Sequence, residues 1–167
     1  RIRRADKLSG QTDIVMVKDF TAEENGVDIL ESYGYRPVET DPNMVLEIPE
    51  SWQTFDDYLN SLASKYRSGA KKIVKEVTNA GIELEHLKNI DPHATRLHEL
   101  YMNVHSKAAV RLVTLPPDYL PTLATACGDQ FRCTVAKRGS EILGFITSLK
   151  DGDTSVGYYI GFDYETN

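Results

Sequence analysis

Few features of this sequence identify a functional site on their own. Cysteine is scarce: only Cys127 and Cys133 occur among 167 residues, and they provide neither a disulfide framework nor the spacing of a metal site. Cys133 falls in a strand pattern, where we expect a buried thiol. The sequence also lacks a phosphate-binding P-loop, a dinucleotide-binding glycine motif and the Gly-x-Ser-x-Gly elbow of a nucleophilic serine. These absences argue against the most recognisable nucleotide-binding and hydrolase sites.

Long hydrophobic runs are missing as well. No apolar run approaches the roughly 18 residues of a membrane span. The start Arg1-Ile2-Arg3-Arg4 is not followed by the apolar segment of a signal peptide. We therefore expect no membrane span and a cytoplasmic location. The sequence does not begin with Met, so we expect a piece of a longer protein.

Positive charge is in deficit, with 19 Lys and Arg residues against 25 Asp and Glu residues and a net charge of −6. This balance argues against general nucleic-acid binding, and we expect no DNA partner. Residues 65–75 are the exception, because they contain bases and no acid. On a helix, Arg67, Lys71 and Lys75 form one ridge with Lys72 beside it. The ridge predicts a phosphate-binding surface, with a solvated helix face as the alternative.

Three histidines, His93, His98 and His105, lie in or near one predicted helix. Metal ligands on a helix usually sit four residues apart, whereas His98 and His105 are seven apart and have no cysteine or acidic ligand placed with them. We expect partly exposed polar side chains and no metal site.

The residues that are present, 41% of them hydrophobic, suit one ordinary domain of mixed secondary structure. Short branched runs predict strands at 14–17, 35–38 and 44–48. Thr21-Ala22-Glu23-Glu24 has the spacing of a capping box for a helix that should end at Gly34.

Apolar residues at helical spacing follow from Trp52, with Thr54 or Ser51 as the cap. A second helical pattern passes Ser68-Gly69, which favours a kink, and ends at Gly81.

The remaining segments predict a strand at 82–87, a helix opening at Asp91-Pro92 and reaching Ala108, and a short helix at 119–127. Three strands, 131–136, 141–149 and 156–162, then form a meander joined by tight turns. The order predicts an α+β fold in which helices cover a largely antiparallel sheet.

The end of the last predicted strand carries the most suggestive polar residues. Tyr158 and Tyr159 should point to opposite faces of the sheet, and Gly157 and Gly161 flank them, so that another backbone or a ligand could approach closely. Asp163 follows as a carboxylate at a strand end, which can act as a general base if its pKa is raised; ordinary turn chemistry is the alternative.

Two stretches resemble a known family. The first, Trp52 to Arg67, is similar to the segment before the basic helix in GNAT-like acyltransferases related to the Fem peptidoglycan aminoacyltransferases. The second resembles the second GNAT-like unit of those tandem proteins through Leu97 to Tyr101, Leu115-Pro116 and the meander up to Asn167. The resemblance implies that residues 1–50 are the closing part of a first unit and residues 51–167 the opening part of a second.

In the family, an acyl donor lies along a splayed strand and its pantetheine amides bond the strand backbone. The resemblance implies Ile160, Gly161 and Phe162 as donor contacts, with acyl-CoA as cosubstrate and no covalently bound cofactor. A pyrophosphate loop, Arg or Gln followed by glycines, should come after that strand, but residues 163–167 do not contain it.

The activity implied is direct transfer of an acyl group from a CoA thioester to an amine of a small molecule or peptide, with Asp163 as base and Tyr159 as acid. Two alternatives stay open. One is an aminoacyl-tRNA-dependent, Fem-like ligase for cell-wall or peptide substrates whose ridge of Arg67, Lys71, Lys72 and Lys75 contacts RNA phosphates. The other is a noncatalytic binding module.

Overall fold

The computed structural model describes residues 15–17, 26–38, 44–109, 111 and 113–166. The chain divides into two units between Ile48 and Pro49, two residues from the boundary that the sequence predicts. The assignment of these units to two successive GNAT-like repeats stays a prediction. The only regular element described in the first unit is helix α2, Val27–Ser32, which ends before Gly34 as expected.

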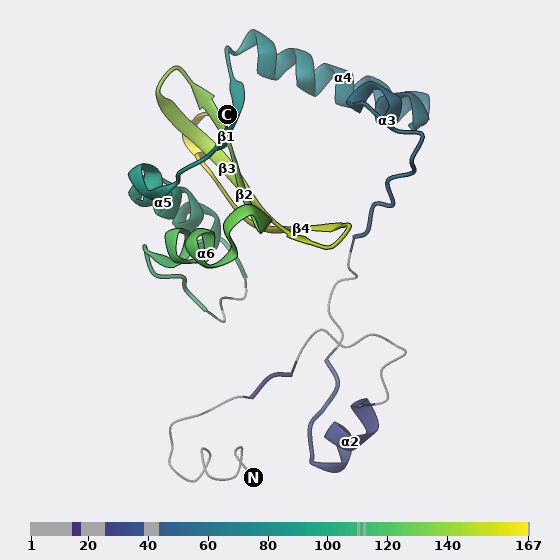
Figure 1. Ribbon diagram of the computed structural model, residues 1–167, viewed down its shortest axis with the longest axis vertical. Coiled ribbons are helices and arrows are strands. Elements are labelled where there is room, and N and C mark those ends of the chain that lie inside the picture. Colours follow the sequence, from purple (N-terminus) through teal and green to yellow (C-terminus); the bar gives the residue numbers. More distant parts are fainter. Residues whose placement is uncertain (1–14, 18–25, 39–43, 110, 112, 167) are drawn as a thin grey trace. The chain divides into compact units, whose positions relative to one another are not determined.

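A four-stranded antiparallel sheet forms the centre of the second unit, with its strands in the order in which they occur along the chain (Figure 1). Glycines with positive φ, Gly139 and Gly152, make the two tight turns of the meander, a conformation that other residues rarely adopt. The strands are β1 (Glu83–Leu87), β2 (Phe131–Arg138), β3 (Glu141–Asp151) and β4 (Thr154–Phe162).

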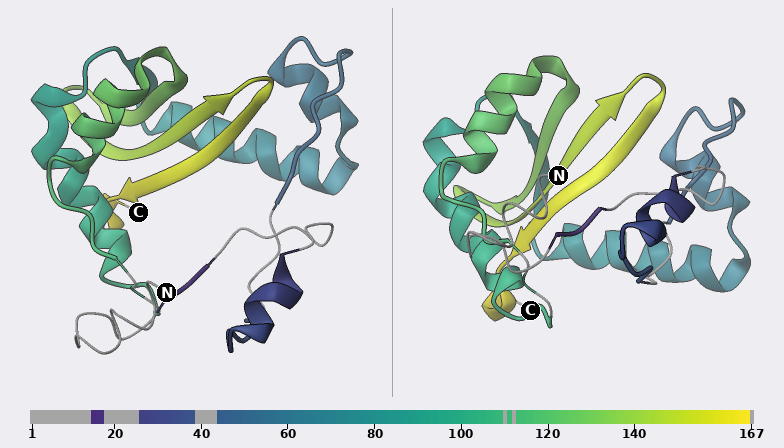
Figure 2. Two further views of the ribbon diagram at one scale, coloured as in Figure 1. Left: turned by 60° about the horizontal axis from the view of Figure 1, so that its bottom comes forward. Right: turned by 90° about the horizontal axis from the view of Figure 1, so that it is seen from below.

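Two helices, α5 (Ala94–His105) and α6 (Tyr119–Cys127), pack on one face of this sheet, as Figures 1 and 2 show. Their apolar residues meet those of β2 and β3 in a single core. Cys133 is fully buried in that core, which confirms the expected buried thiol, and burial raises its pKa to about 11. The core consists of Ile90, Leu97, Leu100, Tyr101, Leu115, Leu120, Cys133, Val135, Ile142 and Phe145. The mixed α+β fold predicted from the sequence is confirmed.

The contact between α5 and β4 is unusually close because Gly161 has no side chain. A Cβ atom at this position would lie 2.5 Å from the backbone carbonyl carbon of Leu100 and 2.5 Å from the backbone nitrogen of Tyr101. It would also lie 2.4 Å from a ring carbon of Phe145. The helix backbone therefore rests directly on the strand.

Helices α3 (Phe55–Ser61) and α4 (Ser64–Asn79) precede the sheet. Thr54 caps α3 in a capping box with Asp57, which confirms one of the two predicted caps. α4 runs through Ser68 and Gly69 without interruption, and the kink expected there stays a prediction. Leu62 is extended between α3 and α4, and α4 ends before Gly81 at positive φ.

Several other predictions need correction. Residues 35–38 and 44–48 form no strands, and neither do residues 15–17 of the predicted strand at 14–17. A strand requires a hydrogen-bonded neighbour, and every strand found among the described residues lies after residue 82. The predicted capping box at Thr21 to Glu24 lies outside the described residues. Asp91 begins a 3₁₀ turn, Asp91–His93, instead of capping α5, and that helix stops at His105, short of Ala108.

Replacing Gly161 with alanine should destabilise the fold by roughly 1–3 kcal/mol, because the added methyl group must push α5 away from β4. Urea unfolding followed by circular dichroism measures the loss. Gly157→Ala is the matched control in the same strand, since a Cβ atom there meets nothing within 4 Å. Equal stability of the two variants would contradict the close packing of helix on strand.

Candidate functional site

A β-bulge interrupts the pairing of β4 with β3 next to the predicted site. Ile146 pairs with Ile160 but Ser148 pairs with Gly157, so two residues of β4 oppose Thr147 alone. Thr147 is fully buried, and its Oγ1 accepts the N–H of Tyr159 at 2.8 Å and donates to the Tyr159 carbonyl at 3.1 Å. One threonine side chain therefore replaces the ladder bonds that the bulge displaces.

The bulge brings Tyr158 and Tyr159 to the same face of the sheet. Their ring centroids lie 4.5 Å apart, and both rings reach Tyr119 of α6. The prediction that they point to opposite faces is wrong, because it assumed an unbroken two-residue alternation that the extra residue shifts. Tyr159 lies between Tyr101 and Tyr119, in edge contact with each. The four tyrosines form a cluster where β4 meets the two helices.

The phenol groups of Tyr119 and Tyr159 stay protonated at neutral pH. Burial, followed by the proximity of Tyr158, raises the pKa of Tyr159. A hydrogen bond to the Tyr158 hydroxyl, 3.1 Å away, raises the pKa of Tyr119, and burial adds to it. Tyr159 therefore keeps the proton that an acid needs, although its predicted catalytic role stays a prediction.

β4 lies at the edge of the sheet, and no strand pairs with its outer side among the residues that the structure describes. The N–H of Asp163 bonds the carbonyl of Leu143 at 2.8 Å, and hydrogen-bonded pairs alternate along antiparallel strands. Counting back from Asp163, Gly161 turns its backbone groups toward Phe145 of β3. Ile160 and Phe162, by contrast, turn theirs to the free edge.

The three predicted donor contacts thus differ in what they offer. The backbone groups of Gly161 pair with β3, and the α5 backbone lies against its Cα, which carries no side chain. Ile160 and Phe162 present backbone groups at the edge and partly exposed side chains. The carbonyl of Phe162 already accepts a long hydrogen bond, 3.4 Å, from Nδ2 of Asn103. An extended ligand could reach the free edge at Ile160 and Phe162.

Asp163 is held in place rather than poised to accept a proton. Its carboxylate accepts the backbone N–H of Glu165 at 3.0 Å and the guanidinium of Arg96, also at 3.0 Å. These two interactions, the backbone bond first, hold the pKa of Asp163 below its usual value. A carboxylate with a lowered pKa is a weak base at neutral pH. The predicted base role is untested, and the geometry favours an anchoring role.

A series of hydrogen bonds at the C-terminal end of α5 is not predicted by the sequence patterns. The hydroxyl of Tyr101 accepts the N–H of Leu115 and lies 3.2 Å from Nδ1 of His105. Nε2 of His105 lies 2.9 Å from Oγ1 of Thr114, and His98 donates to the Leu115 carbonyl. These bonds attach residues 114–115 to α5. Only the four-residue spacing of Tyr101 and His105 could have suggested it.

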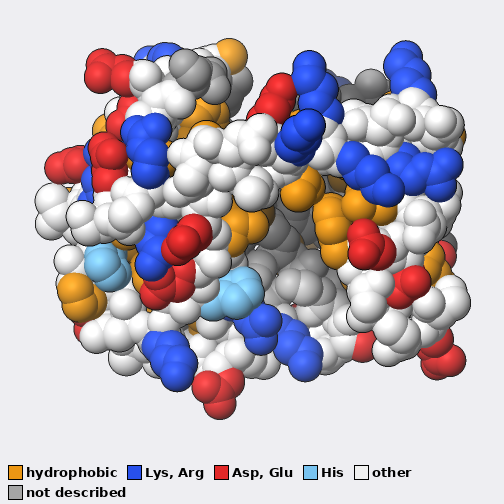
Figure 3. Space-filling model, turned by 90° about the horizontal axis from the view of Figure 1, so that it is seen from above, with side chains coloured by type: hydrophobic (Ala, Val, Ile, Leu, Met, Phe, Trp, Pro, Cys, Tyr) orange, Lys and Arg blue, Asp and Glu red, His pale blue; other side chains and the backbone are white. Residues whose placement is uncertain are grey.

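The predicted phosphate-binding ridge lies on α4, where no described residue is buried. Lys72 pairs with Glu76 at 3.6 Å, whereas no described carboxylate lies within 4.0 Å of Lys71 or Lys75. Arg67 donates to the carbonyl of Asn60. Figure 3 shows basic side chains beside exposed apolar ones on the face that it views. Phosphate binding by the ridge stays a prediction.

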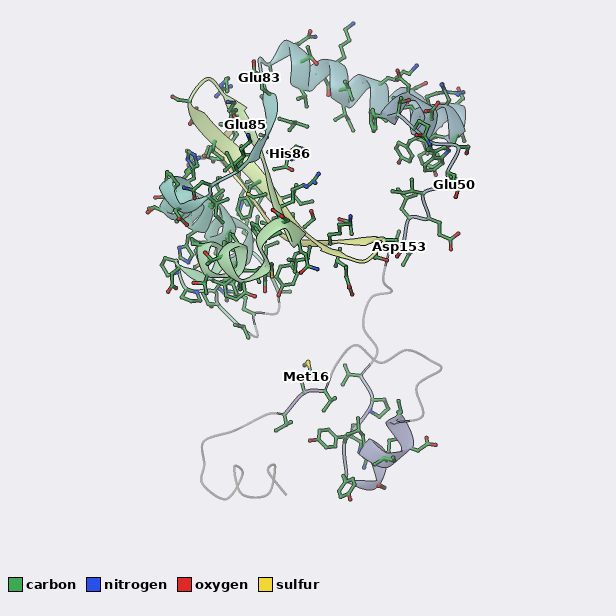
Figure 4. The ribbon with its side chains drawn as sticks, viewed as in Figure 1. Met16, Glu50, Glu83, Glu85, His86 and Asp153 are labelled. Carbon is green, nitrogen blue, oxygen red and sulfur yellow. The ribbon has the colours of Figure 1, made fainter. Side chains whose placement is uncertain are left out.

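Other polar groups lie away from the edge of β4. Figure 4 labels Glu85 and His86 on β1, at the opposite edge of the sheet; Glu85 pairs with Lys137 and His86 bonds Thr134 across the strands. His93, His98 and His105 are partly buried as expected. In the part of the chain that is described, no three His, Cys, Asp or Glu side chains gather closely enough to hold a metal ion. None of the described helices is both long and apolar enough to cross a membrane.

A family model described as an acetyltransferase (GNAT) domain matches residues 64–167. The match covers α4, the whole sheet and the two helices that pack on it. A search of curated proteins found no match.

Removing the hydroxyl of Thr147 should disturb the bulge. We expect Thr147→Val to lose about 1–3 kcal/mol of stability, because the buried backbone groups of Tyr159 lose their partner. Thr147→Ser keeps the hydroxyl and should retain most of that stability. Denaturant unfolding measures both variants, and a Thr147→Val protein as stable as the wild type would contradict the role of the hydroxyl.

Asp163 should contribute to the pH dependence of stability. Its folded pKa lies below the unfolded value of about 3.9, so its contribution is present above that value and is lost as the pH falls through the folded pKa. Asp163→Asn should therefore flatten the loss of stability below about pH 4. Urea midpoints measured from pH 6 to pH 2 test this, and parallel curves for the two proteins would contradict it.

Proposed function

Because the chain belongs to the family of acetyltransferases with a GNAT domain, we propose that it transfers an acyl group from a CoA thioester to an amine. The family supports acyl transfer in general and an amine as the acceptor. That the donor is a CoA thioester goes beyond what the family supports, and the observation in its favour is the free edge of β4.

An acyl-CoA carries an extended arm with amide groups, which pair with a strand edge as another strand would. At Ile160 and Phe162 the structure offers backbone groups turned outward on an edge strand. The bulge at Tyr158 and Tyr159 lies next to this edge, and bulges commonly redirect side chains beside active sites. The donor's thioester would then lie near the tyrosine cluster.

The chemistry requires a neutral amine to attack the thioester carbon. The new C–N bond forms, the C–S bond breaks, and the amine proton goes to a base while the CoA thiolate takes up a proton. Orientation of both partners supplies much of the rate, since two bound reactants no longer need to collide. Tyr159, with its raised pKa, would donate to the leaving sulfur, and its neighbours Tyr119 and Tyr101 would hold its ring in place.

The acceptor would approach from the side of α5 and α6, where the cluster lies. Tyrosine rings attract an ammonium group through their negative faces, so an amine could dock there before it loses its proton. The loop at 113–118 borders this face and is held to α5 through Tyr101 and His98. An amine-bearing small molecule or peptide fits this surface.

One experiment compares the two donors that the sequence leaves open. The full-length protein is supplied with labelled acetyl-CoA or with labelled aminoacyl-tRNA and a mixture of amine acceptors. We expect label transfer from acetyl-CoA, and a rise of about 2.7 kcal/mol in stability at 100 times the dissociation constant. Thermal unfolding with and without acetyl-CoA measures the stabilisation.

Three outcomes separate the alternatives. Transfer only from aminoacyl-tRNA, with binding that weakens steeply with salt, would support a Fem-like ligase that uses the basic ridge of α4. Arg67→Ala/Lys71→Ala is the variant that should then lose binding. Neither transfer nor stabilisation would favour a noncatalytic binding module. Stabilisation by acetyl-CoA but not by desulfo-CoA lacking an acyl group would support recognition of the thioester end.

A further inference from the structure

The side chain of Arg96 joins three elements at the end of β4. From α5, Nε donates to the carbonyl of Ile142 at 3.1 Å and Nη2 donates to the carboxylate of Asp163 at 3.0 Å. Nη1 lies 3.3 Å from Glu99 on the same helix. One guanidinium thus connects the start of β3, the residue that follows β4, and helix α5 itself.

The two contacts on the sheet fall at points where its regular pairing breaks. Ile142 pairs with Lys137 whereas Gly144 pairs with Ala136, so β3 carries an extra residue at Leu143. Arg96 bonds the carbonyl of Ile142 beside this bulge, and Leu143 bonds the N–H of Asp163. Arg96 and the bulge therefore act on the same short stretch of both strands.

Two further side chains hold the same exit from the side of α5. Asn103, seven residues after Arg96, donates to the carbonyl of Phe162. Lys107 lies 3.1 Å from the centre of the Tyr164 ring, in a cation–π contact. Residues 162–164 are thus bound one after another to α5 and its C-terminal end.

We propose that Arg96 is a positioning residue for the acyl donor. By holding Ile142 and Asp163, it fixes the exit of β4 and with it the outward-facing backbone groups of Ile160 and the backbone N–H of Phe162. The inference rests on the proposed function, because it assigns to these groups the binding of the donor. It adds a residue of α5 that touches neither the donor nor the reacting atoms.

The position requires arginine rather than any base. Its planar fork supplies donors in three directions at once, and each acceptor lies in a different one. The ion pair is also partly shielded, with 32% of the Arg96 side chain and 19% of the Asp163 side chain exposed. Lysine would keep one charge contact but would lose the bond to Ile142.

The test measures acetyl-CoA binding and turnover for Arg96→Ala, Arg96→Lys and Asp163→Asn in the full-length protein. We expect Arg96→Ala to raise the dissociation constant for acetyl-CoA about tenfold, the effect expected if the ordered exit is then populated in about a tenth of the unliganded molecules. KM for the donor should rise in parallel while kcat changes little. Arg96→Lys should fall between wild type and Arg96→Ala, and Asp163→Asn should weaken donor binding as well.

Arg138→Ala is the matched control, because Arg138 also pairs with an acid three residues away, Glu141, but its side chain is 50% exposed. Among the described residues, no side-chain hydrogen bond joins Arg138 to Ile142 or Asp163. It should leave donor binding unchanged. If Asp163→Asn lowers kcat and leaves donor binding unchanged, Asp163 is the base and the positioning role is wrong.

Different results would overturn the proposed function and the positioning role of Arg96. Wild-type protein that binds no acetyl-CoA overturns the proposed function and, with it, the role of Arg96 toward that donor. Wild-type binding that Arg96→Ala does not weaken overturns the positioning role alone. Hydrogen exchange at residues 159–165 reports whether Arg96→Ala has loosened the exit, and loosening without weaker binding also contradicts the proposal.

Discussion

The direct contact of α5 with β4 at Gly161 is the constraint on which the rest of the second unit depends. A helix normally stands off a sheet by the length of the side chains between them. Here the missing Cβ atom lets the backbone at Leu100 and Tyr101 touch the strand. Arg96, one turn earlier on the helix, and Asn103, near its end, then come within reach of the exit of β4. The tyrosine cluster is assembled by the same approach, since Tyr101 meets Tyr159 across it.

The candidate site combines a regular sheet edge with a β-bulge. The sheet supplies a rigid edge, and the bulge opposite Thr147 turns two adjacent tyrosines to one side of it. The edge faces outward while the cluster faces α5 and α6. A donor and an acceptor could thus approach the same few residues from different directions. Such an arrangement suits the joining of two substrates.

Much of the sheet could be predicted from the sequence, because its signals are local. The three meander strands follow from alternating apolar residues and from turns at Gly139 and Gly152, which act over a few positions. Strands at 35–38 and 44–48 looked equally plausible by the same rule and did not form. Their failure shows that an apolar run specifies a strand only where another strand is available to pair with it.

The details of the site were harder to predict, because they arise from distant parts of the chain. The local signal of the bulge at Tyr158 and Tyr159 is limited to the neighbouring Gly157, because the hydroxyl that supports the bulge belongs to Thr147, on another strand. Asp163 is recognisable as a strand-end carboxylate, but its partner Arg96 lies 67 residues earlier. The backbone N–H of Glu165 and then this guanidinium hold the pKa of Asp163 below its usual value, which the sequence around Asp163 does not predict. Gly161 predicts an opening for a ligand, but the space beside it is filled by the backbone of α5 and the ring of Phe145 from the same chain.

An edge strand that is open to a ligand is equally open to another polypeptide. Ile160 and Phe162 expose apolar side chains along a strand edge that no described strand covers, a combination that favours strand-to-strand aggregation. Asp153, in the turn directly before β4, carries a negative charge that would disfavour a second copy approaching in parallel register. A ligand bound along this edge would therefore also shield β4 from pairing with another copy of the chain.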